Sequence, residues 1–201
     1  MPTPRLAGPA DIPRLARSLT AAFADDPVFA HVLPEGPRRL ERMERFFSLI
    51  ASVHLRSGHV YVTDGIEGGA LWDPPGRWRI PIGTQLGLAL PLLRVYGRRS
   101  FQHLADFHHL ARVPAQTPPD HWYLGILGTD PAHQGRGIGS AVLQPVLDLA
   151  DAEGAGAYLE SSKESNISYY RRFGFEVVCE HPFHAGGPMV WPMWRDPQPP
   201  T

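Results

Sequence analysis

The sequence predicts an α/β fold built on a mixed sheet. Three observations predict it: two amphipathic helical patterns stand near the start, an alternating hairpin pattern follows them, and a mostly apolar run at 121–129 opens a region where helical and strand patterns alternate. With 201 residues the chain can close one substantial core, so we expect a single domain over residues 1–201.

The N-terminal elements are expected to be two helices, a hairpin and a further helical region. Asp11 is a suitable N-cap for a helix that runs to about Ala24, because apolar residues repeat behind it at helical spacing. The same spacing predicts a second helix over 38–56, and alternation on both sides of a turn predicts a hairpin over 59–75. Residues 83–113 are rich in Leu and His and are expected to be helical in two or three pieces.

The C-terminal elements alternate between strand and helix. The apolar run His121–Thr129 is typical of a buried central strand. A long helix is expected over 137–153 and should end at Gly154, while Pro145 within it predicts a kink or a shorter first segment. The remaining expected elements are a strand at 156–162, a short helix at 166–174, and two final strands at 175–183 and 188–195.

Charge and composition exclude several classes of partner. A net charge of -1 and a pI near 6.8 give no general attraction to nucleic acid or to an anionic membrane. The longest apolar stretch, at 80–97, is interrupted by Pro, Gly and polar residues, and the N-terminus lacks the pattern of a signal peptide, so we expect a cytoplasmic protein. Cys179 is the only cysteine and is expected to be a small packed side chain.

The stretch QGRGIGS at 134–140 lies where a strand is expected to end and a helix to begin. The first amides of a helix lack backbone partners, and glycine lets an anion approach them closely. An anion site is therefore one hypothesis, and a tight turn without a ligand is the competing one.

Two familiar phosphate loops match this stretch poorly. A P-loop needs Lys and then Ser or Thr after its last glycine, where this chain has Ser140 and Ala141. Gly135, Gly137 and Ser140 approximate a dinucleotide fingerprint, with Glu160 about twenty residues further on. However, DPAHQ separates that loop from the strand, and too little chain follows Glu160 for the second half of a dinucleotide-binding fold.

The stretch TDPAHQGRGIGSAVL resembles the acyl-CoA-binding motif of the GNAT superfamily of N-acetyltransferases, Q/R-x-x-G-x-G/A after a strand, carried here by Gln134, Gly137 and Gly139. The later YLESSKESNISYYRRFGFEVV resembles the last motif of the same superfamily: a strand, an Asn, then a Tyr a few residues before GF. More narrowly, AAFADDPVFAHVLPE, GALWDPP and DPAHQGRGIGSAVLQPVL are similar to the puromycin N-acetyltransferase branch.

This resemblance implies a mixed, mostly antiparallel central sheet, flanked by helices and splayed at an acyl-CoA site. It implies acetyl-CoA as the acyl donor, an N-terminal half at 1–120 with acceptor-site helices, and an acetyl-CoA-binding core at 121–195. The loop amides would hold the pyrophosphate, and the end of the central strand would pair with the pantetheine arm. The implied donor-site residues are Leu127, Gly128, Thr129, Gln134, Gly135, Arg136, Gly137, Ile138, Gly139, Ser140 and Asn166.

Acetyl transfer to an amine needs a base, a site for the developing oxyanion and a proton for the leaving thiolate. Tyr170 matches the family tyrosine that can donate that proton, whereas Tyr169 is expected to pack or to face elsewhere. Asn166 matches a cofactor contact and is also a suitable helix N-cap. Glu160 matches a position that faces the cleft in some relatives and is the candidate base. Histidines are its rivals: His31, His54, His108, His109 and His121.

The acceptor is expected to be the amine of a small molecule, which attacks directly in a ternary complex, and an antibiotic-like amine is the specific hypothesis. The residues that could flank its cleft are Trp72, Asp73, Trp122 and Tyr123, with the core as the competing position for the aromatics. No metal is expected, because His103 has Phe107 rather than a histidine one helical turn later, and the pair His181 and His184 has no cysteine or carboxylate cluster nearby. We expect a monomer or a homodimer. The alternatives are an inactive acyl-CoA-binding regulatory module and a nicotinamide-dependent oxidoreductase.

Overall fold

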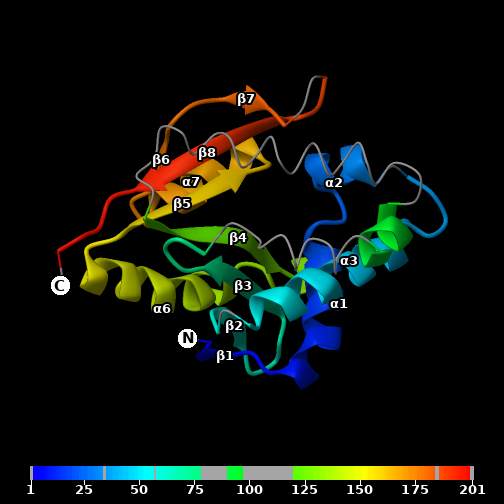
Figure 1. Cartoon of the computed structure of the whole chain (residues 1–201), viewed down its shortest axis with the longest axis horizontal. Helices are drawn as coiled ribbons and strands as arrows, with labels where there is room; N and C mark the ends of the chain where they lie inside the picture. Colours follow the sequence, from blue (N-terminus) through cyan, green and yellow to red (C-terminus); the bar gives the residue numbers. More distant parts are fainter. Residues whose placement is uncertain are drawn as a thin grey trace.

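The structure is a computed structural model, described over residues 2–33, 35–56, 58–77, 90–96, 120–183 and 186–199. Its strands are β1 (Pro4–Leu6), β2 (Val60–Thr63), β3 (Gly68–Asp73), β4 (His121–Thr129), β5 (Gly156–Ser161), β6 (Glu176–Val177), β7 (His181–Pro182) and β8 (Met189–Arg195). They form one sheet in the order β1-β2-β3-β4-β5-β8-β6, from bottom to top in Figure 1, and β7 pairs with β8 off this path.

The sheet is mixed and mostly antiparallel, as the sequence predicts. Among the pairings of the described strands, β4 with β5 is the parallel one, and the others are antiparallel. The helices are α1 (Ile12–Ala22), α2 (Pro27–Val32), α3 (Arg39–His54), α6 (Ile138–Glu153) and α7 (Ile167–Arg171), with single turns of 3-10 helix at η1 (Pro9–Asp11), η4 (Pro131–His133) and η5 (Glu164–Asn166). Residues 90–96 are also helical. None of the described helices has the length and hydropathy that a membrane crossing requires.

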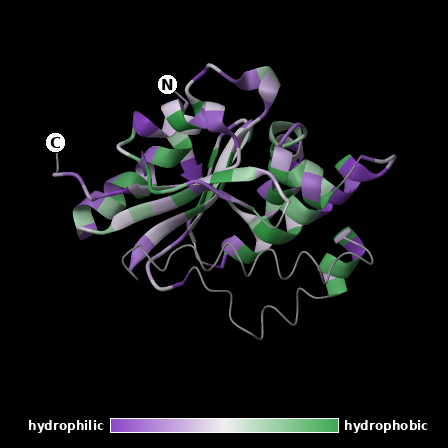
Figure 2. Ribbon diagram, turned by 90° about the horizontal axis from the view of Figure 1, so that it is seen from above, coloured by the Kyte–Doolittle hydropathy of each residue, from purple (hydrophilic) through white to green (hydrophobic). Residues whose placement is uncertain are grey.

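Two hydrophobic clusters cover opposite faces of the sheet, because alternate residues of a strand point to opposite faces. In β3, Leu71 belongs to one cluster, while Ala70 and Trp72 belong to the other. The N-terminal core packs α1 and α3 on the sheet and includes Leu15, Leu19, Met43, Phe47, Val60, Val62 and Leu71. The C-terminal core packs α6 and α7 on the other face and includes Ala70, Trp72, Trp122, Leu124, Val142, Leu143, Val146, Leu147, Leu159, Tyr170 and Phe175. Figure 2 shows both green and purple stretches on the helices, as expected for helices with one face on a core.

The helical predictions hold with three differences. Helix α1 ends at Ala22, and Asp11 makes no side-chain cap bond to it; the carboxylate instead accepts from Gly8 N at 2.8 Å and from the Arg5 guanidinium. Helix α6 runs through Pro145 without interruption, so the shorter first segment is wrong. A proline removes its own N–H from the hydrogen-bond ladder and crowds the carbonyl four residues before it, but the residues around Pro145 pack in the C-terminal core and so hold the helix together.

Two short elements were not predicted from the sequence. Helix α2 begins where Asp26 Oδ1 accepts from the amides of Val28 and Phe29, at 2.9 and 3.0 Å, with Pro27 in the first turn. Strand β1 has three residues and pairs with β2. Of the expected helical region 83–113, residues 90–96 are described and helical, and the rest lies outside the described residues.

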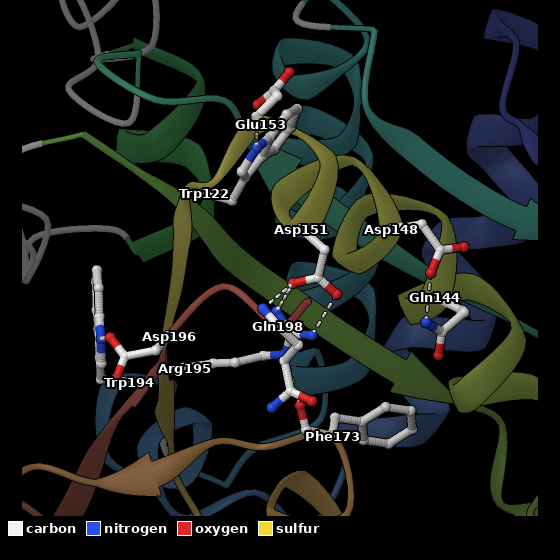
Figure 3. A network of polar contacts seen from close by, with 10 residues as sticks. All are labelled: Trp122, Gln144, Asp148, Asp151, Glu153, Phe173, Trp194, Arg195, Asp196 and Gln198. Atoms are coloured by element: carbon white, nitrogen blue, oxygen red, sulfur yellow. Dashed lines mark hydrogen bonds and ion pairs between the residues drawn. The ribbon is translucent and has the colours of Figure 1, made fainter. Parts of the chain in front are cut away.

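The end of the chain is tied down by a group that we call the C-terminal clamp, drawn in Figure 3. Both terminal nitrogens of Arg195 donate to the Asp151 carboxylate at 2.7 Å, and its Nε donates to the carbonyl of Phe173 at 2.7 Å. The amide of Gln198 donates to the same carboxylate. The clamp joins β8, α6 and the turn after α7, and the Arg195 hydrogen bonds hold the pKa of Asp151 below its usual range.

Candidate functional site

Strands β4 and β5 stop pairing before either strand ends. Their last parallel pair is Leu124 with Leu159, yet β4 continues to Thr129 and β5 to Ser161. Within the described part of the chain, β4 residues 125–129 therefore have a strand partner only on the β3 side. We call the opposite side of these residues the unpaired edge, because its backbone groups are available to an extended ligand.

A β-bulge at Gly125 stands at the start of the unpaired edge, on the β3 side of β4. Leu71 of β3 pairs with Ile126, but the next residue, Trp72, pairs with Leu124, so Gly125 is an extra residue in β4. The bulge also shifts the alternation: Leu124 lies in the C-terminal core, while Ile126 packs against the N-terminal core. We did not foresee this bulge, although a glycine inside an apolar strand is the feature that could have indicated it.

The glycine loop follows β4 after the single turn η4, and its geometry suits an anion. Gly135 and Gly137 have φ angles of 76° and 79°, in the left-handed region that favours glycine, and Gly137 precedes the first turn of α6. The amides of residues 138–140 are the first of the helix, so they have no intrahelical acceptor and carry the positive end of the helix dipole. No described side chain caps them from the N-cap position. Residues 134–137 are exposed, which leaves room for a phosphate group.

The other donor-site residues lie around this loop. Gln134 Nε2 donates to the carbonyl of Thr129 at 3.4 Å and so braces the loop against the end of β4. The Arg136 side chain is exposed. Gly128 is buried against α1: a Cβ on it would lie 2.8 Å from Leu19 Cδ2, so only glycine fits there. Leu127, half-buried, packs on the C-terminal core.

Tyr170 and its neighbours form the side of the site that shares a face with α6. Tyr170 is 8% exposed and lies edge-to-face with Tyr169 and Phe175, at centroid distances of 5.4 and 6.1 Å. Burial raises the pKa of its phenol well above the ordinary value, with smaller contributions from Tyr169 and Asp26. The group is therefore a neutral phenol with a proton to donate at any physiological pH.

Tyr169 and Asn166 differ in what they do for the site. Tyr169 packs, as expected, against Tyr170 and Phe173, and its hydroxyl lies 2.7 Å from the position of a Cβ on Gly139. Asn166 occupies the N-cap position of α7 but makes no cap bond, so the capping role is wrong. Its exposed side chain faces no described hydrogen-bond partner.

Glu160 lies on the opposite face of the sheet, because Leu159 beside it belongs to the C-terminal core. Its Oε2 accepts a hydrogen bond of 2.8 Å from the Tyr123 hydroxyl. Burial raises the pKa of Glu160 to about 7, and the hydroxyls of Tyr123 and Tyr158 limit that rise. Of these two phenols, Tyr123 donates a hydrogen bond to the carboxylate. The Tyr158 hydroxyl lies near the carboxylate but makes no hydrogen bond to it.

A second polar pair, His54 with Asp73, lies next to the bulge. His54 Nε2 is 3.3 Å from Asp73 Oδ2, and its Nδ1 is 2.9 Å from the carbonyl of Ile50. Both neighbours are acceptors, so a doubly protonated ring satisfies them best. Burial lowers the pKa of His54, but the Asp73 carboxylate and the Ile50 carbonyl outweigh it and the net shift is upward. His54 Nε2 also lies 3.5 Å from the position of a Cβ on Gly125.

The other expected site residues lie elsewhere. Trp72 and Trp122 are in the C-terminal core, which is the alternative that the sequence left open to a place in the acceptor cleft. His121 is buried against the rings of Tyr158 and Trp194. The remaining rivals for the base are His31, which lies against Phe183, and His108 and His109, which are outside the described residues. His103 and His184 are also outside them, and no group of three metal-ligating side chains occurs among the residues that are described.

We did not foresee a contact between the loop before α2 and the loop after β5. Asp26, which is 2% exposed, accepts a hydrogen bond from the Ser162 hydroxyl, and Lys163 Nζ pairs with Asp25 Oδ1 at 2.6 Å. The two contacts bridge 136 and 138 residues of sequence. They fix the N-terminal segment beside the end of β5.

The sequence is similar to those of known proteins. The profile of the family described as "Acetyltransferase (GNAT) family" matches residues 99–175. An uncharacterised N-acetyltransferase of Schizosaccharomyces pombe is 30% identical over 175 residues, which are 82% of this chain and 70% of that protein. The N-alpha-acetyltransferase RimI of Mycobacterium tuberculosis is 33% identical over 120 residues, which are 58% of this chain and 74% of that protein.

Solved structures share the fold over the whole length of the chain. A Corynebacterium glutamicum structure, described as histone acetyltransferase HPA2 and related acetyltransferase, is 27% identical with a TM-score of 0.71, covering 100% of this chain and 98% of its own. Arylalkylamine N-acetyltransferase 2 of Aedes aegypti has the same fold at 15% identity, with a TM-score of 0.64 and coverage of 97% and 98%. The sequence relatives are N-acetyltransferases, and none of these matches is a nicotinamide-dependent oxidoreductase. The chain belongs to the GNAT family of N-acetyltransferases.

Proposed function

We propose that this N-acetyltransferase transfers the acetyl group of acetyl-CoA to the amine of a small molecule, by direct attack while both substrates are bound. One observation supports this most: Tyr170 and Leu127 of the unpaired edge both pack in the C-terminal core, on the α6 face, whereas Glu160 lies on the opposite face of the sheet. A proton donor and a proton acceptor on opposite sides of one opening suit a reaction in which the donor and the acceptor enter from different faces.

On the donor side, members of the GNAT family use acetyl-CoA, which supplies an acetyl group activated as a thioester. The amides of residues 135–140 would hold its pyrophosphate, since they stand at an exposed helix start without acceptors of their own. The unpaired edge at Leu127, Gly128 and Thr129 would pair with the pantetheine arm. Arg136 and Asn166, both exposed beside the loop or α7, would add side-chain contacts.

The two proton transfers fall to groups that burial has adjusted. Tyr170 retains its proton and would donate it to the departing sulfur, because its raised pKa keeps the phenol neutral. Glu160 has a pKa raised to about 7, so near neutral pH it is both partly ionised and basic enough to take a proton from an amine nitrogen. The acid and the base are thus separate residues.

For the acceptor, we propose a small cationic amine of the antibiotic-like kind, in keeping with the resemblance to the puromycin N-acetyltransferase branch. Two carboxylates, Asp73 and Glu160, flank Tyr123 on the acceptor face, and carboxylates attract a cationic amine. Residues 1–120 would supply this face and 121–195 the donor site. The two halves would act as one domain, since β3 pairs along β4 from Asp73 to Gly68.

The test is a thiol-release assay with acetyl-CoA and a panel of amines, with product masses as confirmation. The panel contains puromycin, other small primary amines, polyamines and peptides with a free α-amine. Turnover with small amines supports the proposal. Turnover with peptide α-amines alone would overturn the acceptor class, and acetyl-CoA binding by calorimetry without any turnover would favour the inactive regulatory module instead.

A further inference from the structure

Tyr123 occupies the position between the bulge and Glu160. Its hydroxyl donates to Glu160 Oε2 at 2.8 Å, and its ring stacks on Tyr158 at a centroid distance of 6.0 Å. It stands two residues before the bulge, with its Cε1 at 3.7 Å from the position of a Cβ on Gly125. The phenol therefore reaches from the opened part of β4 to the candidate base.

The hydrogen bond to Glu160 uses the one proton of the phenol and leaves its oxygen lone pairs free to accept. Among the described residues, none donates to the Tyr123 oxygen. An amine nitrogen carries N–H donors, so an acceptor amine at the bulge complements this oxygen. The result would be an ordered chain of hydrogen bonds from the amine to Tyr123 and then to Glu160.

We propose that Tyr123 relays the proton of the acceptor amine to Glu160, an inference that rests on the proposed function. The amine reacts in its neutral form, after its ammonium proton has passed to water, and Glu160 starts as the carboxylate. A proton then leaves the amine nitrogen for Tyr123 Oη as the Tyr123 proton moves to Glu160 Oε2. The nitrogen lone pair forms the new bond to the acetyl carbon, the carbon–sulfur bond breaks, and the sulfur takes its proton from Tyr170. Tyr123 ends as a neutral phenol, Glu160 releases its proton to water, and Tyr170 is reprotonated from water.

The surroundings of Tyr123 require its two proton transfers to be coupled. The titratable groups that face it are Glu160 and Tyr158 on β5 and Asp73 on β3, with His54 of α3 paired to Asp73 and Cys179 near Tyr158. Burial and the two carboxylates raise the pKa of Tyr123 well above the ordinary value, so a free phenolate is strongly disfavoured. A proton can arrive at the oxygen only as the other one leaves.

The experiment compares Tyr123→Phe with the wild type in steady-state kinetics and in mixtures of H₂O and D₂O. We expect kcat to fall about 100-fold with a KM for acetyl-CoA within about 3-fold of the wild type, because general acid–base steps contribute about 10²- to 10⁴-fold. The wild-type rate should curve with the deuterium fraction, as expected for several protons in flight, and the residual rate of the variant, which lacks the two transfers at Tyr123, should curve less. Loss of the Tyr123 hydrogen bond should also raise the apparent pKa of the acid limb.

Two further variants separate a relay from a structural role. Tyr158→Phe removes the other phenol beside Glu160, so the apparent pKa should rise while the curved isotope dependence remains. Tyr61→Phe, on β2 and away from the site, should match the wild type, and melting temperatures establish that each variant is folded. Wild-type kcat in Tyr123→Phe, or a linear isotope dependence in the wild type, would overturn the relay alone. Absence of amine acetylation by the wild type would overturn the relay and the proposed function together.

Discussion

At the scale of single residues, burial is what prepares the two candidate catalytic groups. Removing a phenol from water favours its neutral form, and removing a carboxyl from water does the same. For Tyr170 the consequence is a phenol that keeps its proton until the departing thiolate accepts it. For Glu160 the consequence is a basicity raised to about neutral pH. One physical effect therefore supplies an acid in one case and a base in the other.

We expect Tyr170→Phe to lower kcat by about 10²-fold or more, while the KM for acetyl-CoA changes less than about 3-fold. The substitution removes the proton donor but keeps the ring that packs against Phe175 in the C-terminal core. Steady-state kinetics measures both constants, and Tyr61→Phe is the matched control, since Tyr61 is half-buried and lies on β2. An unchanged kcat would remove Tyr170 from the mechanism.

Glu160→Gln should stabilise the protein at alkaline pH while it abolishes turnover. In the unfolded chain Glu160 loses its proton near pH 4.5, whereas the folded chain retains it to about pH 7. Between these values the folded state binds more protons, so the free energy of unfolding of the wild type falls as pH rises. The glutamine variant lacks this slope.

The measurement is urea unfolding of both proteins at pH 4 and pH 8. The stability advantage of the variant over the wild type should be larger at pH 8 than at pH 4 by about 3 kcal/mol. The same stability difference at both pH values would mean that Glu160 is not the group with the raised pKa. Retention of turnover would mean that it is not the base.

At the scale of elements, the contact between the start of α6 and α7 depends on one glycine. A Cβ on Gly139 would lie 2.7 Å from the Tyr169 hydroxyl, and the next nearest atom, Tyr169 Cζ, would be at 3.5 Å. The Tyr169 ring is packed against Tyr170 and Phe173, so it has little freedom to retreat. The missing side chain therefore lets the candidate acid helix approach the candidate phosphate loop.

We expect Gly139→Ala to raise the KM for acetyl-CoA several-fold and to lower the free energy of unfolding by about 1 to 3 kcal/mol, because the added methyl group overpacks the contact. The decisive control is the same substitution in a Tyr169→Phe background, which removes the clashing oxygen. There the alanine should be neutral or stabilising, since alanine is a better helix former than glycine. Additive effects in this double-mutant cycle would contradict the contact.

The elements also differ in how far the sequence could predict them. Strand β4 has the predicted bounds, because an unbroken apolar run is a local pattern. Strand β1 has three residues, begins with Pro4, and exists because β2 pairs with it, which no local pattern records. Helix α2 was not predicted, because its short sequence is also typical of a turn, although Asp26 before Pro27 is a common start of a helix.

The residues of the site also differ in whether a local sequence pattern could predict them. The glycine loop and Tyr170 could be predicted because their residues are close together in the sequence. The hydrogen bond between Tyr123 and Glu160 spans 37 residues and depends on the parallel register of β4 and β5. The pair of His54 and Asp73 depends on how α3 packs on β3. Such contacts are set by tertiary packing, so the sequence named these residues without pairing them.

At the scale of the whole molecule, carboxylates that are ion-paired in the folded state tie down segments far from the centre. Asp11 pairs with Arg5 of β1, and the pKa of Asp11 is lowered to about 2 by the Arg5 hydrogen bonds and the Gly8 amide. Asp151 holds Arg195 in the C-terminal clamp. The pair of Asp25 and Lys163 contributes less, because the Asp25 side chain is 83% exposed.

From these carboxylates we predict that the protein loses stability in acid over a defined range of pH. Their folded-state pKa values are lower than those of the unfolded chain, so their contribution to stability is complete above about pH 4 and is lost as pH falls toward about 2. We expect the free energy of unfolding to fall steeply between these values, as measured by urea unfolding at a series of pH values. Equal stability at pH 5 and pH 2.5 would contradict this account.

Asp151→Asn tests how much the C-terminal clamp contributes to the free energy of unfolding. At pH 7 it should lower the free energy of unfolding by about 3 kcal/mol, because it leaves the Arg195 guanidinium, 4% exposed, without its counter-charge. The acid dependence of the variant should be shallower than that of the wild type, since one of the carboxylates that must be protonated is gone. Asp148→Asn, on the exposed side of α6 with Gln144 as its hydrogen-bond partner, is the matched control and should change stability by less than about 0.5 kcal/mol. If both variants behaved alike, the clamp would be a surface contact without a role in holding β8 to α6.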